Sequence, residues 1–426
     1  MLKICIIRNF FVTLRPKINL NLNQTRKNYS EQHMIGIFND NFPPILDGVA
    51  LTAQNYAYWF QKKGYEVAVI TPYAPNSEDV LNAAQYPIYR YPSIPIPYRP
   101  PYRYGLPYAS PRFWNQWRKM KFEIVHSHCP FTSSNLALSA SIKQQIPLVA
   151  TFHSKYRQDF EHNVKNKKVV DWMIRTIIKF YEKADEVWIP QAAVEPTLRE
   201  YGFKGHVEVV ENGNDFYTPK EQIEVMRTEM REELGLLPDE TMLLFVGQHI
   251  WEKNIGLILD SLALIKERPF QLFMVGTGYA VREIRHKINE LGLSDHVTLL
   301  GNIHDRERLK RIDAAADLFL FPSLYDNAPL VVREAAALHT PALLLSESTA
   351  AEVINPDVNG FLATNDKESY SQRIASLIEH PEILKRVGNK ASKTISRSWE
   401  NVIEEVLLRY RDIEQSYKLK HGIIVP

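Results

Sequence analysis

The sequence predicts an α/β protein made of two Rossmann-like halves, and three observations lead to this fold class. A strand–helix–strand pattern begins at Met34, and a second one begins at Met242 with the apolar run MLLFVG. The same order of elements returns over residues 321–345, where apolar strands flank a helix. The 426 residues are enough for two domains of ordinary size.

The composition is that of a globular protein without disulfide bonds or membrane spans. The chain is 45% hydrophobic and 23% charged, which is typical of a globular protein, and its net charge of +2 argues against wholesale nucleic-acid binding. Its two cysteines, Cys5 and Cys129, are too few for a disulfide framework or a cysteine metal site. No run approaches the eighteen or so apolar residues of a membrane span. We therefore expect a cytoplasmic protein.

Residues 1–33 form a leader without a fold pattern. Arg8 breaks the short apolar run at the start, no small-residue cleavage site follows, and the rest is polar. The run MIGIFND at Met34, by contrast, is typical of a first strand. We expect the leader to be either disordered or not native.

Residues 34–213 are predicted to form the first domain. The strand MIGIFND is followed by a loop with Gly48, a helix that ends at Gly64, and the strand EVAVITP. Gly48 lets a ligand or another backbone approach closely, although one glycine is weak evidence. At the far end of this domain, Asn212 and Gly213 indicate a turn before the polar linker DFYTPKEQ.

Residues 80–122 differ from the rest in composition. They hold eight prolines, seven tyrosines, two tryptophans, seven lysines or arginines and no acid. We expect no packed helix here. The segment is either a proline-rich surface excursion or a surface for anionic lipid head groups, with aromatic side chains at the depth of the interface.

Three histidines follow or end two predicted strands of this domain. FEIVHSH contains His126 and His128, and PLVATFHS contains His153. The carboxyl ends of parallel strands meet at one edge of a sheet, where α/β proteins bind ligands. A lone histidine in such a place is usually a satisfied polar group, and no nearby acid supports a metal site.

Residues 214–398 are predicted to form the second domain. After the strand MLLFVG, the loop QHIWEKN places Lys253 before a helix over residues 254–266. A lysine there either neutralises a phosphate as a point charge or is simply solvated. Residues from about 381 to 418 are expected to be helical, with an apolar stripe that includes Trp399. We assign residues 399–426, the last part of this helical region, to a separate tail.

Residues 321–345 contain the most informative helix. Asp326 and Asn327 offer capping oxygens before Pro329, so we expect the helix to begin at about Ala328. Its first amides then form an anion site at a strand end. Glu334 lies on the helix face one turn after the start, where a carboxylate suits ribose hydroxyls. An ordinary capped Rossmann helix with a solvated glutamate would show the same pattern.

The spacing of Asp326 and Glu334 resembles the E-x7-E signature of retaining GT-B glycosyltransferases of glycosyltransferase family 4. Gly247, Lys253 and Asn254 match the family segment GRxxxxKN, and HSHCPF and TFHSKY resemble two further family motifs. The resemblance runs from about Met34 to Trp399. It departs from the family at three positions, which are Asp47, Gln248 and Asp326.

This resemblance implies the GT-B fold, in which two Rossmann-like domains face each other across a cleft and a C-terminal helix crosses back to the first domain. It implies transfer of a hexose from a nucleotide sugar, with UDP preferred, and with retention of configuration. Neither cofactor nor metal is expected, because the chain has no D-x-D carrier for a divalent ion.

The resemblance also implies roles for individual residues. The expected catalytic residues are His128, Lys253 and Asp326. Donor binding is expected of Gly48, Gly247, Gln248, Lys253, Ala328, Pro329, Leu330 and Glu334. The acceptor or membrane side is expected to include His153, Arg99, Arg103, Trp114, Trp117, Lys119 and Lys121.

The stretch PSIPIPYRPPYRYGLP resembles a segment of diacylglycerol glucosyltransferases, which implies a lipid acceptor and a peripheral position at the inner face of an anionic plasma membrane. Other interpretations stay open. The acceptor could instead be a soluble glycan. The enzyme could instead be an epimerase or a phosphorylase. A third alternative is a degenerate member that binds a nucleotide sugar without transfer.

Overall fold

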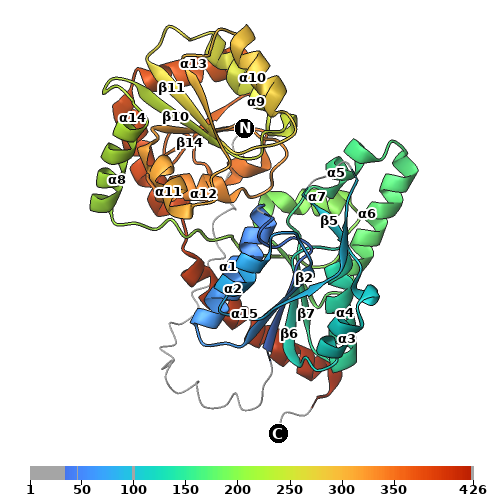
Figure 1. The fold of residues 1–426 in the computed structure, drawn as a ribbon. Helices are drawn as coiled ribbons and strands as arrows, with labels where there is room; N and C mark the ends of the chain where they lie inside the picture. The colour runs from blue at the N-terminus through green and yellow to red at the C-terminus, as the bar shows by residue number, and fades with distance from the viewer. Residues whose placement is uncertain (1–33, 46, 98–100, 424–426) are drawn as a thin grey trace, which may run out of the picture.

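The computed structural model describes residues 34–45, 47–97 and 101–423. The predicted leader over residues 1–33 and the predicted membrane-side residue Arg99 lie outside this part of the chain. Two parallel sheets dominate the described residues, one in each half of the sequence, and Figure 1 shows them as the centres of two separate bodies. We refer to each sheet with its covering helices as the first and the second domain.

The first domain contains a sheet of seven strands in the order β3-β2-β1-β6-β7-β8-β9, all paired in parallel. The strands are β1 (Met34–Phe38), β2 (Val67–Pro72), β3 (Ile88–Tyr91), β6 (Phe122–Ser127), β7 (Leu148–Thr151), β8 (Glu186–Ile189) and β9 (Glu208–Val209). The helices are α1 (Gly48–Lys62), α2 (Glu78–Ala83), α3 (Pro111–Trp117), α4 (Thr132–Gln144), α5 (Tyr156–Asn163), α6 (Lys167–Tyr181) and α7 (Glu195–Glu200). A short antiparallel hairpin is added by β4 (Ser93–Pro95) and β5 (Arg103–Gly105).

The second domain contains a parallel sheet of six strands in the order β12-β11-β10-β13-β14-β15. The strands are β10 (Thr241–Val246), β11 (Phe270–Val275), β12 (Val297–Gly301), β13 (Leu318–Phe321), β14 (Ala342–Leu345) and β15 (Phe361–Ala363). The helices are α8 (Lys220–Glu233), α9 (Ile255–Ala263), α10 (Val281–Glu290), α11 (Arg306–Ala315), α12 (Leu330–Ala337), α13 (Lys367–Ile378) and α14 (Pro381–Thr394). Short 3₁₀ turns occur in both domains. The first domain has η2 (Pro107–Ala109) and η3 (Ala192–Val194), and the second has η4 (Trp251–Lys253) and η5 (Thr349–Val353).

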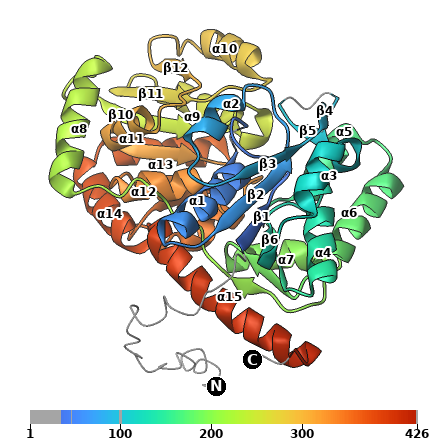
Figure 2. The ribbon, with the colours of Figure 1, turned by 60° about the horizontal axis from the view of Figure 1, so that its bottom comes forward.

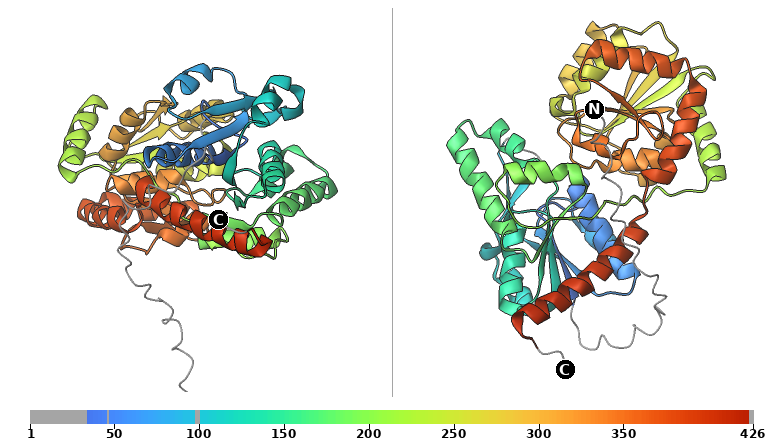
Figure 3. Two further views of the ribbon diagram at one scale, coloured as in Figure 1. Left: turned by 90° about the horizontal axis from the view of Figure 1, so that it is seen from below. Right: turned by 180° about the vertical axis from the view of Figure 1, so that it is seen from behind.

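The last helix, α15 (Trp399–His421), leaves the second domain and packs on the first. Trp399, Val402 and Val406 are buried in the same apolar cluster as residues of α1 and β1. Figure 3 shows α15 running along the first domain beside α1, and Figure 2 shows it from another side. The predicted GT-B architecture, including the helix that crosses back, is therefore confirmed.

Two predictions about helices are corrected. The helical tail is two helices rather than one, because residues 395–398 form a break where Asn214 Nδ2 donates to Ser396 Oγ at 2.7 Å and Ser398 caps α15. Residues 80–122 do form a packed helix, α3, which buries Phe113 and Trp117. Proline does not prevent it, since Pro111 lies in the first turn, where the missing N–H has no intrahelical partner in any case.

Candidate active site between the two sheets

The carboxyl ends of β6 and β7 bring the predicted histidines together. His128 Nδ1 and His153 Nε2 share a hydrogen bond of 3.1 Å, and their rings are stacked at 5.4 Å between centroids. His126 lies within β6 and has a structural environment, since its ring nitrogens contact Tyr410 Oη at 2.6 Å and Thr151 Oγ1 at 2.7 Å. Of the three, His128 and His153 are therefore the pair at the strand ends.

Burial sets the charge of this pair. It lowers the pKa of His128 well below the usual value, and it lowers the pKa of His153 to about 3. Both imidazoles are therefore neutral near pH 7, each with one donor and one acceptor nitrogen. His128 Nε2 is buried and has no hydrogen-bond partner among the described residues. A buried polar atom without a partner is costly, and a bound ligand is one way to satisfy it.

Across from the histidines, the ends of β10 and β13 bring Lys253 and Asp326 together. Lys253 Nζ donates to both carboxylate oxygens of Asp326, at 2.5 and 2.7 Å, and Ser323 Oγ donates to one of them at 2.6 Å. The Lys253 side chain is only 10% exposed. This lysine is thus a buried, paired cation rather than a solvated one.

The start of α12 differs from the prediction. The helix begins at Leu330 rather than at about Ala328, and neither Asp326 nor Asn327 caps it. Asp326 is drawn to Lys253, and Pro329 takes the N-cap position with an extended ψ of 125°. The amides of the first turn consequently have no side-chain cap, and they lie at the carboxyl end of β13, where helix starts bind anions.

The loop between β13 and α12 contacts the first domain directly. Asn327 Nδ2 donates to the His153 carbonyl at 2.9 Å, and Lys155 Nζ donates to the Leu324 carbonyl at 2.8 Å. Tyr325 Oη donates to Asp159 at 2.6 Å. These contacts place the Asp326 loop beside the histidines. No role was predicted from the sequence for Lys155, which lies within the motif TFHSKY, or for Tyr325, which precedes Asp326.

Glu334 is buried on α12 and is held by an arginine that the sequence reasoning missed. Arg306 Nη2 donates to Glu334 at 2.6 Å and to Asp215 at 2.7 Å, and its guanidinium lies 4.4 Å from the centre of the Phe216 ring. Burial raises the pKa of Glu334, and the charge of Arg306 opposes that rise. Arg306 follows the carboxyl end of β12, and this position at a strand end is the signal that could have found it.

The glycine-containing loops have different surroundings. Gly48 is the first residue of α1, and a Cβ built on it would meet no atom within 4 Å, so space is open in front of it. The N-terminus of α1 is capped by Asp47, which accepts from the Ala50 amide at 2.7 Å. In the second domain, Gly247 and Gln248 follow β10, and Gln248 Nε2 faces Tyr102 Oη of the first domain at 3.5 Å.

The described residues predicted for the membrane side differ in their exposure. Trp117 is 6% exposed and packs edge-on against Phe38, so it is a core residue rather than an interfacial one. Arg103 donates to Ser93 within the hairpin of β4 and β5. Trp114 is half-buried, and Lys119 and Lys121 are exposed.

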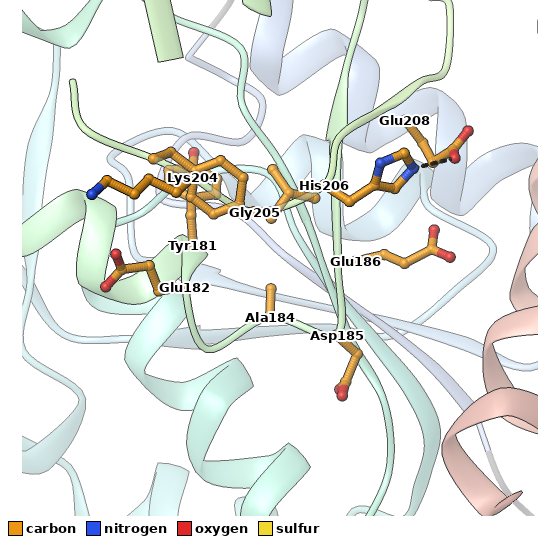
Figure 4. Close-up of a pocket in the computed structure, with 11 residues that line it drawn as sticks. Tyr181, Glu182, Ala184, Asp185, Glu186, Lys204, Gly205, His206 and Glu208 are labelled. Carbon is orange, nitrogen blue, oxygen red and sulfur yellow. Dashed lines mark hydrogen bonds and ion pairs between the residues drawn. The ribbon is translucent and has the colours of Figure 1, made fainter. Parts of the chain in front are cut away.

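A separate hollow lies at the opposite edge of the first sheet. Figure 4 shows it between the end of α6, the start of β8 and the segment before β9. Its lining includes Glu186, the first residue of β8, and contains none of the predicted site residues. Parallel sheets bind ligands at the carboxyl ends of their strands, so this hollow is not the candidate active site.

The described residues contain neither a metal-binding cluster nor a helix that could span a membrane. No group of three or more His, Cys, Asp or Glu side chains in this part of the chain could hold a metal ion. Among the helices of the same residues, none is long and apolar enough to cross a membrane.

Two curated relatives are synthases of the same name. The α-monoglucosyldiacylglycerol synthase of Streptococcus pneumoniae is 24% identical over 355 residues, which cover 82% of this chain and 79% of that protein. The synthase of the same name from Acholeplasma laidlawii is 25% identical, with 84% of this chain and 91% of that protein covered.

Solved structures show the same fold. Anabaena HepE in complex with UDP and glucose has a TM-score of 0.72 at 18% identity, and covers 89% of this chain and 99% of its own. Sucrose-phosphate synthase from Thermosynechococcus elongatus also has a TM-score of 0.72, at 20% identity, with 91% and 100% covered.

Family models match both domains. The model "Glycosyltransferase Family 4" matches residues 46–216, and the model "Glycosyl transferases group 1" matches residues 226–394. The chain is therefore a GT-B glycosyltransferase, with a family 4 N-terminal domain and a group 1 C-terminal domain.

Proposed function

We propose that this enzyme moves a hexose from a nucleotide sugar, with UDP as the favoured nucleotide, to a lipid acceptor such as diacylglycerol or a glycolipid. The observation that carries the proposal is the bond from Asn327 Nδ2 to the His153 carbonyl at 2.9 Å. It joins the loop of Asp326 to the edge that carries His128. The site thereby has a cationic, anion-binding side and a neutral imidazole side, as transfer between two substrates requires.

The donor is assigned to the second domain. The uncapped amides of α12 and the ammonium of Lys253 suit a diphosphate, and the Glu334 carboxylate suits ribose hydroxyls. The fold relative HepE is seen with UDP and glucose, which supports a UDP-linked hexose here. We assign residues 34–213 to acceptor binding, residues 214–398 to donor binding, and residues 399–426 to the crossing helix and tail.

The chemical demand is to stabilise negative charge on the departing diphosphate. Lys253 and the α12 amides supply positive charge that is fixed before the reaction, which is the most effective form of such stabilisation. Asp326 is the counter-charge of Lys253. We propose that phosphate oxygens share Lys253 with Asp326, and that Asp326 then orients sugar hydroxyls beside His128 Nε2. No step in this scheme uses a metal, and the configuration at the anomeric carbon is retained.

The lipid acceptor is supported by the relatives. Both α-monoglucosyldiacylglycerol synthases align over most of this chain, and the segment rich in proline, tyrosine and basic residues lies in the first domain. Such an acceptor requires the enzyme to work at a membrane surface. We therefore propose a peripheral position on an anionic membrane. The second candidate, transfer to a soluble glycan, is favoured by the exposed tyrosines Tyr104 and Tyr108, which suit stacking against sugars.

A panel of nucleotide sugars crossed with lipid extract and with soluble glycans tests this function. Mass spectrometry of the products is expected to show a hexosyl lipid, with nucleoside diphosphate released only when the lipid is present. Transfer to glycans alone would contradict the lipid acceptor. A free epimer, a requirement for phosphate or binding without turnover would contradict the transferase itself.

A further inference from the structure

The outer face of α6 carries an exposed tryptophan. All seven tryptophans lie in the described part of the chain, and Trp172 alone among them is largely exposed, at 61%. Val169, one turn earlier, is 40% exposed. The opposite face of the helix is buried in the core of the first domain through Val170, Ile174 and Ile177. The exposed tryptophan is therefore not needed to anchor α6.

Basic side chains surround Trp172 on this face. Lys168, Arg175 and Lys179 are exposed at spacings of seven and four residues, which place them along one stripe of the helix. Over its fifteen residues α6 has four basic residues and one acid, Asp171, and that acid is paired with Arg157 at 2.8 Å. Among the described residues, no ion pair neutralises the three stripe cations. We name Lys168, Trp172, Arg175 and Lys179 the α6 stripe.

Helix α6 lies on the side of the first domain that is turned away from the second domain, as Figures 1 and 3 both show. It is also one helix away from the candidate active site. α6 packs against α5, and Asp159 of α5 accepts a hydrogen bond from Tyr325 in the loop that carries Asp326. A flat surface against α6 would thus lie near the site without blocking the second domain.

We propose that the α6 stripe is the surface through which this enzyme docks on an anionic lipid bilayer. The inference rests on the proposed lipid acceptor and assigns the contact with the bilayer to one defined helix face. Lysine and arginine side chains attract anionic head groups, and tryptophan prefers the depth of the interface. The stripe offers both on a rigid element, with the cations on either side of the indole.

Sedimentation with phosphatidylglycerol vesicles at low salt tests this docking surface. The triple variant Lys168→Glu, Arg175→Glu, Lys179→Glu is expected to bind at least about a hundredfold more weakly than the unchanged protein. The matched control is Lys385→Glu, Lys390→Glu, Lys393→Glu, which makes the same change of charge on exposed residues of α14 in the second domain. This control is expected to bind within about fivefold of the unchanged protein.

Trp172 provides a second, direct measurement. Brominated phosphatidylglycerol is expected to quench the tryptophan emission of the unchanged protein, and this quenching is expected to disappear in Trp172→Phe. Thermal unfolding and UDP binding serve as checks that each variant is folded, since all stripe residues are exposed.

The outcomes distinguish a failure of the proposed membrane function from a failure of the proposed docking surface. If the unchanged protein does not bind the vesicles at low salt, the proposed membrane function fails, and the docking surface fails with it. If the unchanged protein binds but the α6 triple variant binds equally well, only the docking surface is wrong. Equal loss in the α6 and α14 variants would also overturn it, because net charge rather than a particular face would then govern binding.

Discussion

At the scale of single residues, the candidate site consists of charges that are paired with one another. Lys253 holds both oxygens of Asp326, and Arg306 holds Glu334. All four side chains lie at the carboxyl edge of the second sheet, where a nucleotide diphosphate would add negative charge. Donor binding therefore has to redistribute existing ion pairs, and the cost of breaking them reduces the affinity that new contacts provide.

Lys253→Ala and His128→Ala are each expected to lower turnover by at least about a hundredfold. The first removes the cation nearest the proposed leaving group, and the second removes the unpartnered imidazole nitrogen on the opposite side. Steady-state release of nucleoside diphosphate measures both. Lys266→Ala, at an exposed lysine beyond α9, is the control and should be silent. Full activity of either site variant would count against the mechanism.

Glu334→Gln is expected to raise the donor dissociation constant more than it lowers the turnover number, because ribose contacts act in the ground state and the transition state alike. Calorimetric titration with UDP measures this. Normal UDP affinity in the variant would show that the ribose is held elsewhere.

Arg306→Met is expected to weaken UDP binding, and more strongly at pH 6 than at pH 8. Without Arg306, burial raises the pKa of Glu334 further, so the carboxylate becomes protonated as the pH falls. Titration with UDP at the two pH values measures the effect. Arg311→Met, on the same helix but paired at the surface with Glu229, is the control. Equal losses at both pH values would mean that Arg306 acts in some other way than on the charge of Glu334.

The sequence could place Lys253 and Glu334 because each lies at a fixed distance from a strand end in a recognisable motif. It could not show what Asp326 binds. A capping role was the local interpretation, but the partner of Asp326 is 73 residues earlier in the chain, and that pair draws the carboxylate away from the helix. Arg306 was missed for a related reason, since its acidic partner is 28 residues away and no local pattern records it.

At the scale of elements, the first sheet owes part of its cover to α15. Tyr410 of this helix reaches His126 within β6, and Gly213 lies so close to Trp399 that a Cβ there would be 2.7 Å from the Trp399 backbone. These contacts join residues far apart in the chain. The apolar stripe predicted the helix, but its break at residues 395–398 depends on Asn214 and could not be predicted from the local sequence.

Glu123→Gln is expected to stabilise the fold at pH 8 by an amount on the order of 2 kcal/mol and to have little effect at pH 4. Burial, followed by the charge of Glu414 on α15, raises the pKa of Glu123 to about 7. At pH 4 the carboxyl is mostly protonated in both the folded and the unfolded state. As the pH rises toward 7, the unfolded state ionises first, so stability falls, and the amide avoids this loss.

Urea unfolding at the two pH values measures the difference, with Glu267→Gln, at an exposed residue of the second domain, as a control. The same stabilisation at pH 4 and at pH 8 would exclude the titration of Glu123 as its cause.

At the scale of the whole molecule, the two domains are joined by contacts on either side of the candidate site. The Asp326 loop contacts His153 and Lys155, and Glu352 accepts from the amides of Ala192 and Ala193 at 3.1 and 2.6 Å. The resemblance could predict that two domains face each other. It could not predict which loops touch, because those contacts depend on the angle between the domains.

Glu352→Ala is expected to speed hydrogen exchange at the amides of Ala192 and Ala193 by at least about tenfold, since each loses a bond to a charged acceptor. Exchange read by NMR or mass spectrometry measures this. Glu347→Ala, at an exposed glutamate in the same domain, is the control. Unchanged exchange in Glu352→Ala would mean that the domains are not joined through this contact in solution.

The reaction itself gives the most direct test of the proposed function. The enzyme is incubated with a UDP-α-hexose and diacylglycerol in phosphatidylglycerol vesicles, and the anomeric proton of the product is read by NMR. We expect an α-linked hexosyl lipid in an amount equal to the UDP released, with no release when the diacylglycerol is left out. A β-linked product, or transfer to a soluble glycan while diacylglycerol stays unmodified, would contradict the account.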